Sequence, residues 1–417
     1  MKHSPAPVGQ AALRRANLSL VLRELRDHPS LSRAHIAEVT GLHRATVSNL
    51  MAELLERRLV REVGVEHVGA IGRPRRAVAL YGEHVGALGM EINVDYIAVH
   101  GTDLSGRVLV ERRVAYDAMG SGQDSAVRRL GLAAREAVEA MRRAGAVPAG
   151  IAVAVPGLVD VTRGTVTLAP NLYWHDVPLA DQLSTMLGPL GAPVWVDNDA
   201  NLSALAEYTS GVAAGTPYLV YLTGEVGVGG GIILGGELLR GADGYSGEVG
   251  HLQVDPNGDQ CGCGRLGCWE TKVGLAALVR AAMPEQAYGL PGMPVSDPDE
   301  RVADIAKGLA AGDQRMARAV AQVGEWLGLG GSILANLFNP RVIVIGGYFA
   351  SLAEWLLPHA QDQLRRLVVS APIAQCRFVA STLGFGAASR GAANMVVNHI
   401  IDDPAMILDP PPGPALR

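Results

Sequence analysis

Residues 247–251 read GEVGH, and residues 261–270 read CGCGRLGCWE. These two segments place one histidine and three cysteines close together in the chain. Three thiolates and one imidazole are the ligand set of a closed, tetrahedral structural zinc site. The glycines between the cysteines allow a short loop to fold around an ion. The predicted zinc ligands are His251, Cys261, Cys263 and Cys268.

Two other interpretations of these cysteines fit less well. Free buried cysteines need neither dense grouping nor a neighbouring histidine. A redox pair favours the spacing C-x-x-C, which Cys261 and Cys263 do not have. The chain holds four cysteines, three of them in this one loop, so a disulfide framework is not expected. This cysteine usage is typical of a cytoplasmic protein.

Two longer stretches on either side of residue 200 share one pattern. Residues 85–114 and residues 218–240 each alternate apolar runs with short turns, which predicts strand–turn–strand–turn–strand units. Chance similarity of two meanders is the alternative. A repeat of this kind favours a duplicated α/β domain over residues 85–398, with lobes at about 85–200 and 201–398.

The motifs within this domain resemble the ROK family, whose name abbreviates repressor, open reading frame and kinase. The resemblance rests on GEVGH and CGCGRLGCWE, on WVDNDAN at 195–201, on PGLVD at 156–160 and on NLYW at 171–174. It covers nearly the whole chain and implies the two-lobed fold of actin-like ATPases and sugar kinases. It also implies that a pyranose is hydrogen-bonded by Asn198, Asp199, Glu248, His251 and Glu270. Taken singly, each of these acids is compatible with an ordinary surface position.

The phosphate-binding loops differ from those that the resemblance implies for a kinase. Kinases of the family carry Asp-x-Gly-Gly-Thr after the first strand, where this chain has EINVD at 91–95. In the second loop, Glu225 and Val226 replace glycine and threonine. Glycines let backbone N–H groups approach phosphate, and one like charge about 4 Å away costs roughly 4 kcal/mol. The chain is therefore predicted not to be an enzyme, although Asp199 would be the general base in a kinase.

Residues 11–80 have the spacing of a winged helix-turn-helix domain. Apolar periodicity predicts helices at 13–27, 33–39 and about 43–57. Ser32 is the expected N-cap of the second helix, and Gly41 the turn that ends it. Ala37 and Val47 supply the small and aliphatic residues that two steeply crossing helices need.

Apolar strands are predicted at 59–63 and 77–80, and IGRPRR at 71–76 lies between them as a basic wing. Residues 1–80 carry 13 Lys and Arg against 7 Asp and Glu, whereas the remainder carries 23 against 34. A basic head on an acidic body suggests that the head alone contacts a polyanion. The alternative is a three-helix protein-interaction module. The predicted DNA contacts are Arg44, Thr46, Ser48, Asn49, Arg73 and Arg75.

Composition agrees with a globular cytoplasmic protein. Hydrophobic residues make up 48% and charged residues 18% of the 417 residues, which is enough to bury a large core. Residues 1–17 lack the apolar run of a secretory signal, and the uncharged stretch between Glu325 and Arg341 contains Gly, Asn and Pro, so no membrane span is expected. The Pro-rich tail, 402–417, is predicted to be disordered.

The favoured hypothesis is a sugar-responsive transcriptional regulator. Winged-helix domains usually bind paired half-sites, so a homodimer or dimer of dimers on operator DNA is expected. A monosaccharide effector would release it from genes of carbohydrate uptake or catabolism, as the resemblance implies. The first alternative is an ATP-dependent sugar kinase with an attached DNA-binding head. The second is a regulator that has lost sugar binding and responds to a protein partner.

Overall fold

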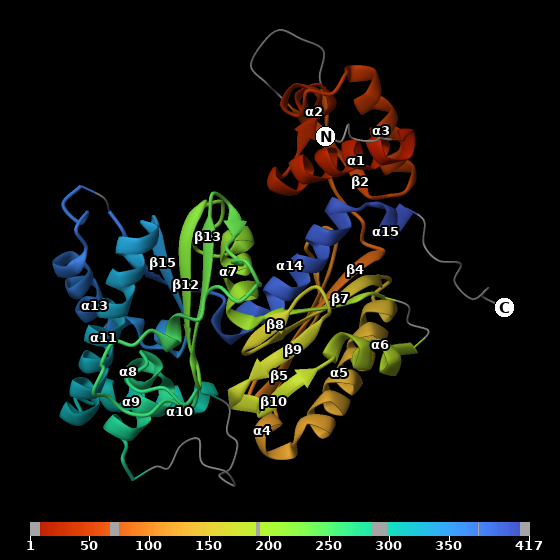
Figure 1. Cartoon of the computed structure of the whole chain (residues 1–417). Helices are drawn as coiled ribbons and strands as arrows, with labels where there is room; N and C mark the ends of the chain where they lie inside the picture. Colours follow the sequence, from red (N-terminus) through yellow and green to blue (C-terminus); the bar gives the residue numbers. More distant parts are fainter. Residues whose placement is uncertain (1–8, 67–74, 189–191, 286–297, 374, 409–417) are drawn as a thin grey trace, which may run out of the picture.

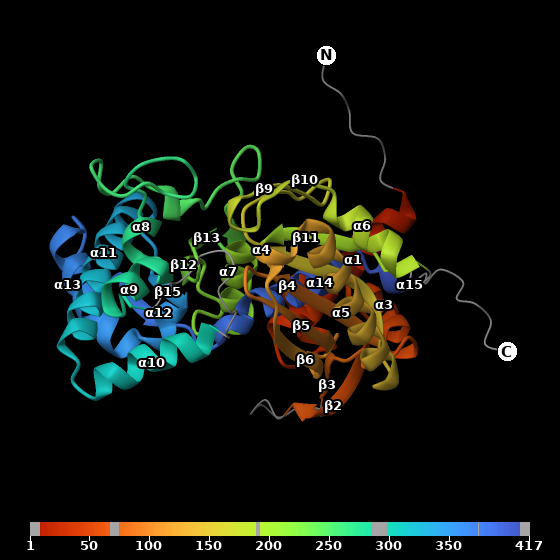
Figure 2. The ribbon, with the colours of Figure 1, turned by 90° about the horizontal axis from the view of Figure 1, so that it is seen from below.

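A head and two lobes make up the protein in a computed structural model that describes residues 9–66, 75–188, 192–285, 298–373 and 375–408 (Figure 1). The lobes lie side by side, and the head sits on the first lobe only (Figures 1 and 2). A winged helix-turn-helix head followed by a two-lobed α/β domain is the predicted fold class, which is thereby confirmed. Within the described residues, no helix combines the length and apolar character needed to cross a membrane.

Within the described residues, the head consists of three helices and a three-stranded antiparallel sheet. Its elements are α1 (Gln10–Asp27), β1 (Leu31–Ser32), α2 (Arg33–Thr40), α3 (Arg44–Glu56), β2 (Val60–Glu66) and β3 (Arg75–Leu80). Ser32 caps α2 by accepting a hydrogen bond from the backbone N–H of His35 at 3.3 Å. Gly41 ends α2 with φ +67°. Both predictions for these two residues are confirmed, whereas β1 is too short for any periodicity to indicate it.

The first lobe is built on a five-stranded sheet of order β11-β7-β4-β5-β6. Its strands are β4 (Val85–Ile92), β5 (Tyr96–Asp103), β6 (Val108–Ala115), β7 (Val147–Val155) and β11 (Val194–Asn198). Helices α4 (Ala118–Ser121), α5 (Gln123–Arg143) and α6 (Leu179–Leu187) accompany it. A small antiparallel sheet of β8 (Leu158–Asp160), β9 (Thr165–Ala169) and β10 (Trp174–Val177) was not expected from the sequence.

The second lobe repeats this topology with a sheet of order β14-β13-β12-β15-β16. Its strands are β12 (Tyr218–Gly224), β13 (Val228–Leu234), β14 (Glu237–Leu238), β15 (Val342–Gly347) and β16 (Arg377–Ala380). Its helices are α8 (Glu270–Val273), α9 (Leu275–Ala282), α10 (Pro298–Ala310), α11 (Gln314–Phe338), α12 (Tyr348–Ser351) and α13 (Ala353–Leu367). In both lobes a three-stranded antiparallel meander is followed by two parallel strands, which confirms the duplication.

Helices α7 (Asp199–Ser210) and α14 (Ala387–Asp402) pack against each other between the two sheets (Figure 1). α7 lies on β13 of the second lobe, whereas α14 lies on β4 and β7 of the first. The packing requires glycine: a side-chain carbon on Gly89 would lie 2.0 Å from the carbonyl oxygen of Ser389, and one on Gly391 would lie 1.8 Å from that of Leu202. The chain therefore returns to the first lobe after residue 386, so the lobes are not two consecutive segments.

Helix also extends into the segment that the sequence predicts to be disordered. α14 continues to Asp402, and α15 covers Ala405–Leu408. Met406 and Ile407 pack against an apolar cluster that joins α14 to the head. The prediction of disorder is therefore wrong for residues 402–408, because two apolar side chains anchor a segment whose proline content suggested otherwise. Residues 409–417 lie outside the described residues.

Candidate functional site

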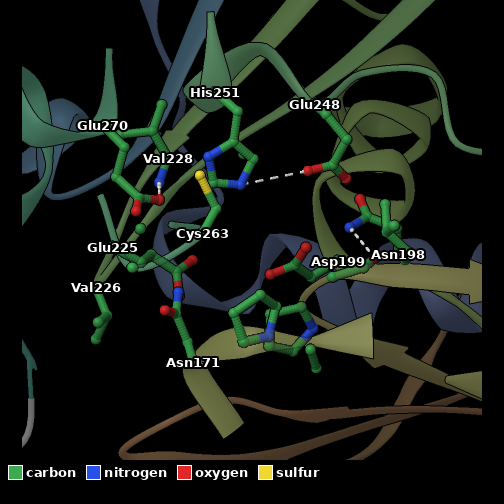
Figure 3. A pocket seen from close by; sticks show the side chains of 18 of the residues that line it. Asn171, Asn198, Asp199, Glu225, Val226, Val228, Glu248, His251, Cys263 and Glu270 are labelled. Atoms are coloured by element: carbon green, nitrogen blue, oxygen red, sulfur yellow. Dashed lines mark hydrogen bonds and ion pairs between the residues drawn. The ribbon is translucent and has the colours of Figure 1, made fainter. Parts of the chain in front are cut away.

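A cavity of about 570 Å³ lies between the two lobes. This volume is within the range of small-molecule sites, roughly 300–1,000 Å³. Its walls come from the turn after β4, from β8 and β9, from the start of α7, and from the loops that follow β12 and β14. Figure 3 shows the polar side chains that point into it.

The start of α7 supplies two polar side chains on the first-lobe side. Asn198 is the N-cap of α7: its Oδ1 accepts from the backbone N–H of Asn201 at 3.0 Å, and its Nδ2 donates to the carbonyl of Gly157 at 3.1 Å. Asp199 accepts from the backbone N–H of Ala200 at 2.8 Å and points into the cavity (Figure 3). Burial raises the pKa of Asp199 to about 6, although backbone hydrogen bonds oppose the shift. The cap thus fixes both side chains at the cavity wall.

The loop after β14 and the start of α8 supply the opposite wall. His251 Nε2 lies 3.8 Å from a carboxylate oxygen of Glu248. Glu270 accepts a hydrogen bond from the backbone N–H of Val228 at 3.1 Å, which orients it toward the cavity. Burial, followed by the charges of Asp199 and Glu270, raises the pKa of Glu248 to about 7. All five residues predicted to bind a sugar line this one cavity.

The four predicted metal ligands also lie together. One donor atom each from His251, Cys261, Cys263 and Cys268 lies within 4.8 Å of all the others, so the group could hold a metal ion. The distance from Cys261 Sγ to His251 Nδ1 is 3.7 Å, and that from Cys263 Sγ to Cys268 Sγ is 3.7 Å. His251 therefore turns Nδ1 to the thiols and Nε2 to the cavity, where Glu248 lies.

The other end of the cavity is lined by Asn93 and Glu225. These two residues belong to a buried polar cluster that joins the lobes, which we call the interlobe cluster: Glu91, Asn93, Tyr96 and Glu225. The Asn93 amide donates to Glu225 across the lobe boundary and to Glu91 at 3.5 Å. The Tyr96 hydroxyl donates to Glu91 at 2.5 Å and to Glu225 at 3.3 Å. Glu225 also accepts from Thr223 at 3.2 Å. The polar atoms of this end are thus largely bonded to one another.

Desolvation dominates the acid–base properties of the interlobe cluster. Burial raises the pKa of Glu91 to about 8, although its hydrogen bonds from Tyr96 and Asn93 act in the opposite direction. Burial and the neighbouring charge of Glu91 raise the pKa of Glu225 well above its usual range. One oxygen of Glu91, Oε2, is buried and has no hydrogen-bond partner among the described residues. The cluster therefore favours protonated carboxyl groups over carboxylates.

The sequence did not predict the interlobe cluster as a set of contacts. It identified Glu91, Asn93 and Glu225 only as departures from a phosphate-binding loop, and it gave Tyr96 no role. No local signal could have paired them, because Asn93 and Glu225 belong to different lobes. Asn171, which lines the cavity beside Glu225, was noticed only as part of a family motif (Figure 3).

The predicted DNA-contacting residues lie in the head. Arg44, Ser48 and Asn49 are exposed on α3, whereas Thr46 is half-buried and presents less surface than expected. The sequence analysis gave no role to His43. This exposed residue is the N-cap of α3, and its side chain accepts a hydrogen bond from the backbone N–H of Ala45 at 3.3 Å. Arg73 and the wing tip lie outside the described residues, and Arg75 is placed only as the first residue of β3.

Comparison with known proteins agrees with the division into a two-lobed domain and a DNA-binding head. The ROK family matches residues 87–399, and the MarR family matches residues 19–69. The xylose repressor of Caldicellulosiruptor bescii is 32% identical over 94% of this chain and 98% of its own. A glucokinase of Streptomyces coelicolor is 33% identical over 59% of this chain and 79% of its own. A crystal structure of a ROK family transcriptional regulator, a homologue of the E. coli MLC protein, aligns with a TM-score of 0.77 at 26% identity, covering 95% and 98% of the two chains.

A winged helix-turn-helix head joined to a two-lobed domain with a polar cavity defines a class of DNA-binding transcriptional regulators. The chain belongs to the ROK family. The two regulators cover 94% and 95% of the chain, whereas the glucokinase covers 59%.

Proposed function

We propose that this protein is a repressor whose affinity for operator DNA is lowered by a monosaccharide bound between its lobes. The observation that carries the proposal is the convergence of Asn198, Asp199, Glu248, His251 and Glu270 on one cavity. A sugar ring presents several hydroxyls, and each polar group buried without a partner costs about 1–3 kcal/mol. A wall of fixed acceptors and donors therefore suits a sugar. D-Xylose is the first candidate, because the similar regulator from C. bescii is a xylose repressor.

Residues from both walls of the cavity would bind the sugar. Asn198 is held by the carbonyl of Gly157 and by the first turn of α7, so its position is set before a ligand arrives. Asp199 directly follows β11 of the first lobe, whereas Glu248 lies in the loop after β14 of the second lobe. A ligand bonded to both would favour the closed arrangement of the lobes over an open one. The position of the head relative to a partner's head would then depend on ligand occupancy.

The metal site suits zinc. With Zn–S distances of about 2.3 Å, tetrahedral geometry separates two thiolate sulfurs by roughly 3.7–3.8 Å, and Cys263 and Cys268 stand 3.7 Å apart. Bound zinc would be structural, because four protein ligands leave no open position. Bound zinc would be coordinated by Nδ1 of His251, so that Nε2 would be the atom that faces a sugar. It would also hold the segment that leads to Glu270 in place.

The interlobe cluster supports a regulator that is not an enzyme. A nucleotide phosphate would need backbone N–H groups or cations at this end, but carboxyl groups of Glu91 and Glu225 occupy it. The competing function is a sugar kinase. The raised pKa of Asp199 favours it, because a general base is most effective when its pKa lies near the ambient pH.

A coupled assay with ATP and a panel of hexoses and pentoses separates the repressor from the kinase. Turnover at ordinary enzymatic rates would contradict the repressor proposal.

The DNA-binding half is tested with the operator. DNA fragments selected by the protein from a random pool serve as probe, with D-xylose, D-glucose and N-acetyl-D-glucosamine as effectors. Operator affinity should fall when one of these sugars is added, and Arg44→Ala, Arg73→Ala and Arg75→Ala should each weaken binding and flatten its salt dependence. A homodimer or dimer of dimers is expected on the selected sites. Loss of all three arginines without effect would refute the assignment of the head.

A further inference from the structure

An ion pair and a hydrogen bond attach the segment between β14 and Glu248 to the first lobe. The hydrogen bond joins the hydroxyls of Tyr245 and Thr167 at 3.4 Å, and the ion pair joins Arg240 and Asp197. Arg240 donates two hydrogen bonds to the carboxylate of Asp197, from Nη1 at 3.2 Å and from Nη2 at 2.6 Å. Asp197 is 1% exposed and stands in β11 directly before the cavity residue Asn198. A bidentate pair fixes orientation as well as distance. The end of β11 and the loop after β14 are therefore held in one arrangement.

The same loop carries part of the cavity wall. The backbone carbonyl of Arg240 accepts from the N–H of Ser246 at 3.0 Å, so the segment from 240 to 246 closes on itself. Tyr245 and Glu248, which follow within or just after this closure, line the cavity. Gly247 has φ +105°, and a side-chain carbon there would lie 2.5 Å from the carbonyl oxygen of Gly230. The loop is thus tightly seated, and Arg240 is at its base.

Beyond Asp197, the strand β11 contacts the last turns of α14. Trp195 stacks on His399 with ring centroids 4.4 Å apart and planes at 14°. Burial lowers the pKa of His399, the charge of Asp402 opposes this, and the charge of Arg240 adds to the lowering. The guanidinium of Arg240 therefore lies within electrostatic range of α14 as well as bonding β11.

The residues on either side of His399 bind the head. Asn398 accepts a hydrogen bond from Arg26 of α1 at 2.7 Å. Asp402 accepts from Arg23 of α1 at 2.7 Å and 3.1 Å. The head and α14 also share one apolar cluster. The last turns of α14 are thus the surface on which α1 rests.

We propose that Arg240 is a positioning residue that couples the sugar cavity to the DNA-binding head through Asp197 and the last turns of α14. The inference rests on the proposed function and specifies how that function is regulated. A ligand that bonds Glu248 and Asn198 acts on both sides of the Arg240–Asp197 pair. The pair then transmits the change to Trp195, and from there to His399 and α1. A buried Asp197 also needs a counter-charge in its own right, so the test must separate coupling from stability.

The experiment compares Arg240→Gln with Arg163→Gln. Arg163 lies in the turn between β8 and β9 and forms a 2.6 Å ion pair with Asp160. Its replacement therefore removes a paired arginine in the first lobe without touching the Arg240–Asp197 pair. Operator dissociation constants are measured with and without D-xylose and D-glucose. Allosteric coupling typically changes affinity about 5–150-fold. Arg240→Gln should reduce this factor to within about 2-fold of one, while sugar still stabilises the protein and Arg163→Gln keeps the full factor.

Two additional variants keep the result interpretable. Arg240→Lys retains the charge but cannot form the bidentate pair, so it should keep only part of the coupling. If Arg240→Gln fails to fold, the double variant Arg240→Gln/Asp197→Asn removes the uncompensated charge and should fold while remaining uncoupled. Independently of any sugar, backbone amides of 395–402 should exchange several-fold faster in Arg240→Gln and unchanged in Arg163→Gln.

The outcomes are distinguishable. If the wild-type protein bound operator DNA equally with and without D-xylose, D-glucose and N-acetyl-D-glucosamine, the proposed function would fail and this inference with it. If the wild-type protein responded to a sugar and Arg240→Gln responded as strongly, the inference alone would be overturned. Unchanged amide exchange at 395–402 in a folded Arg240→Gln protein would also overturn it.

Discussion

The two ends of the interlobe cavity use similar residues in opposite ways. At one end, Asp199, Glu248 and Glu270 direct carboxyl groups into the cavity (Figure 3). At the other end, Glu91 and Glu225 share hydrogen bonds with Asn93 and Tyr96 from the opposite wall. At the first end, Asp199 and Glu270 each accept a backbone hydrogen bond from their own wall, whereas at the second end a side chain of the opposite lobe donates to Glu225. The difference shows that hydrogen bonds across the cavity, and not hydrogen bonds within one wall, close a carboxyl group off from a ligand. The cavity thus combines an open end, where we propose that a sugar binds, with a closed end.

The largest expected effect concerns the loop that supports the open end. Cys263→Ala removes one of the four predicted metal ligands. Loss of a residue that only supports a ligand typically lowers metal affinity roughly 10–100-fold, so the loss of a ligand itself should lower zinc affinity by more than that. Zinc content after dialysis against a chelator, and the melting temperature, measure this. Cys376→Ala is the matched control, because that half-buried cysteine lies outside the cluster. Equal zinc content in the two variants would exclude the assignment.

The next effect tests the open end itself. Asp199→Asn removes a charged acceptor, and hydrogen bonds to charged groups contribute about 1.5–3 kcal/mol, so sugar affinity should fall roughly 10–100-fold. Thermal shift across a D-xylose and D-glucose titration measures it, since ligand at 100 times its dissociation constant adds about 2.7 kcal/mol. Asp181→Asn, at an exposed position of α6, serves as control. If sugar raised the melting temperature of Asp199→Asn as much as that of the wild-type protein, Asp199 would not belong to a sugar-binding end.

The closed end should respond in stability and not in sugar binding. Tyr96→Phe deletes the hydroxyl that donates to Glu91 and Glu225, so the free energy of unfolding should fall by about 1–3 kcal/mol. Urea unfolding gives this value, and sugar affinity should stay within about 2-fold. In Tyr116→Phe, which loses a half-buried hydroxyl bonded to Ser121 at 2.8 Å, the change should be smaller. Weaker sugar binding in Tyr96→Phe would mean that the ends are not independent.

The last prediction is a pH dependence of stability at the closed end, and it is the smallest effect when counted per pH unit. Because the pKa of Glu91 is raised from 4.5 to about 8 in the folded protein, the folded state holds more protons than the unfolded state between these values. Stability should therefore fall as pH rises through this window, by at most about 1.4 kcal/mol per pH unit for one group. Glu91→Gln cannot ionise and should show a shallower slope in urea unfolding. If Glu91→Gln and the wild-type protein showed the same slope, a group other than Glu91 would cause the pH dependence.

Local patterns predicted much of the molecule. The helices of the head follow from apolar spacing and from caps at Ser32 and Gly41, which act over a few residues. The paired strand units appear because alternation and turns are also local. The four predicted metal ligands lie close in the chain, so a short loop is enough to bring them together. The sequence analysis was wrong at 402–408 because it relied on the proline content of the tail. Two apolar side chains there, Met406 and Ile407, pack against the cluster that joins α14 to the head.

By itself, the sequence determined the class of fold and brought together the candidate metal ligands, since both depend on residues near one another in the chain. The acids that line the cavity were indicated by the resemblance to the ROK family. Tertiary structure alone decided which polar groups remain available to a ligand. It paired Asn93 with Glu225, brought Arg240 to Asp197, and returned α14 to the first lobe beneath the head. These contacts join residues far apart in sequence, and burial then changes their hydrogen bonding and pKa values in ways that no local pattern encodes.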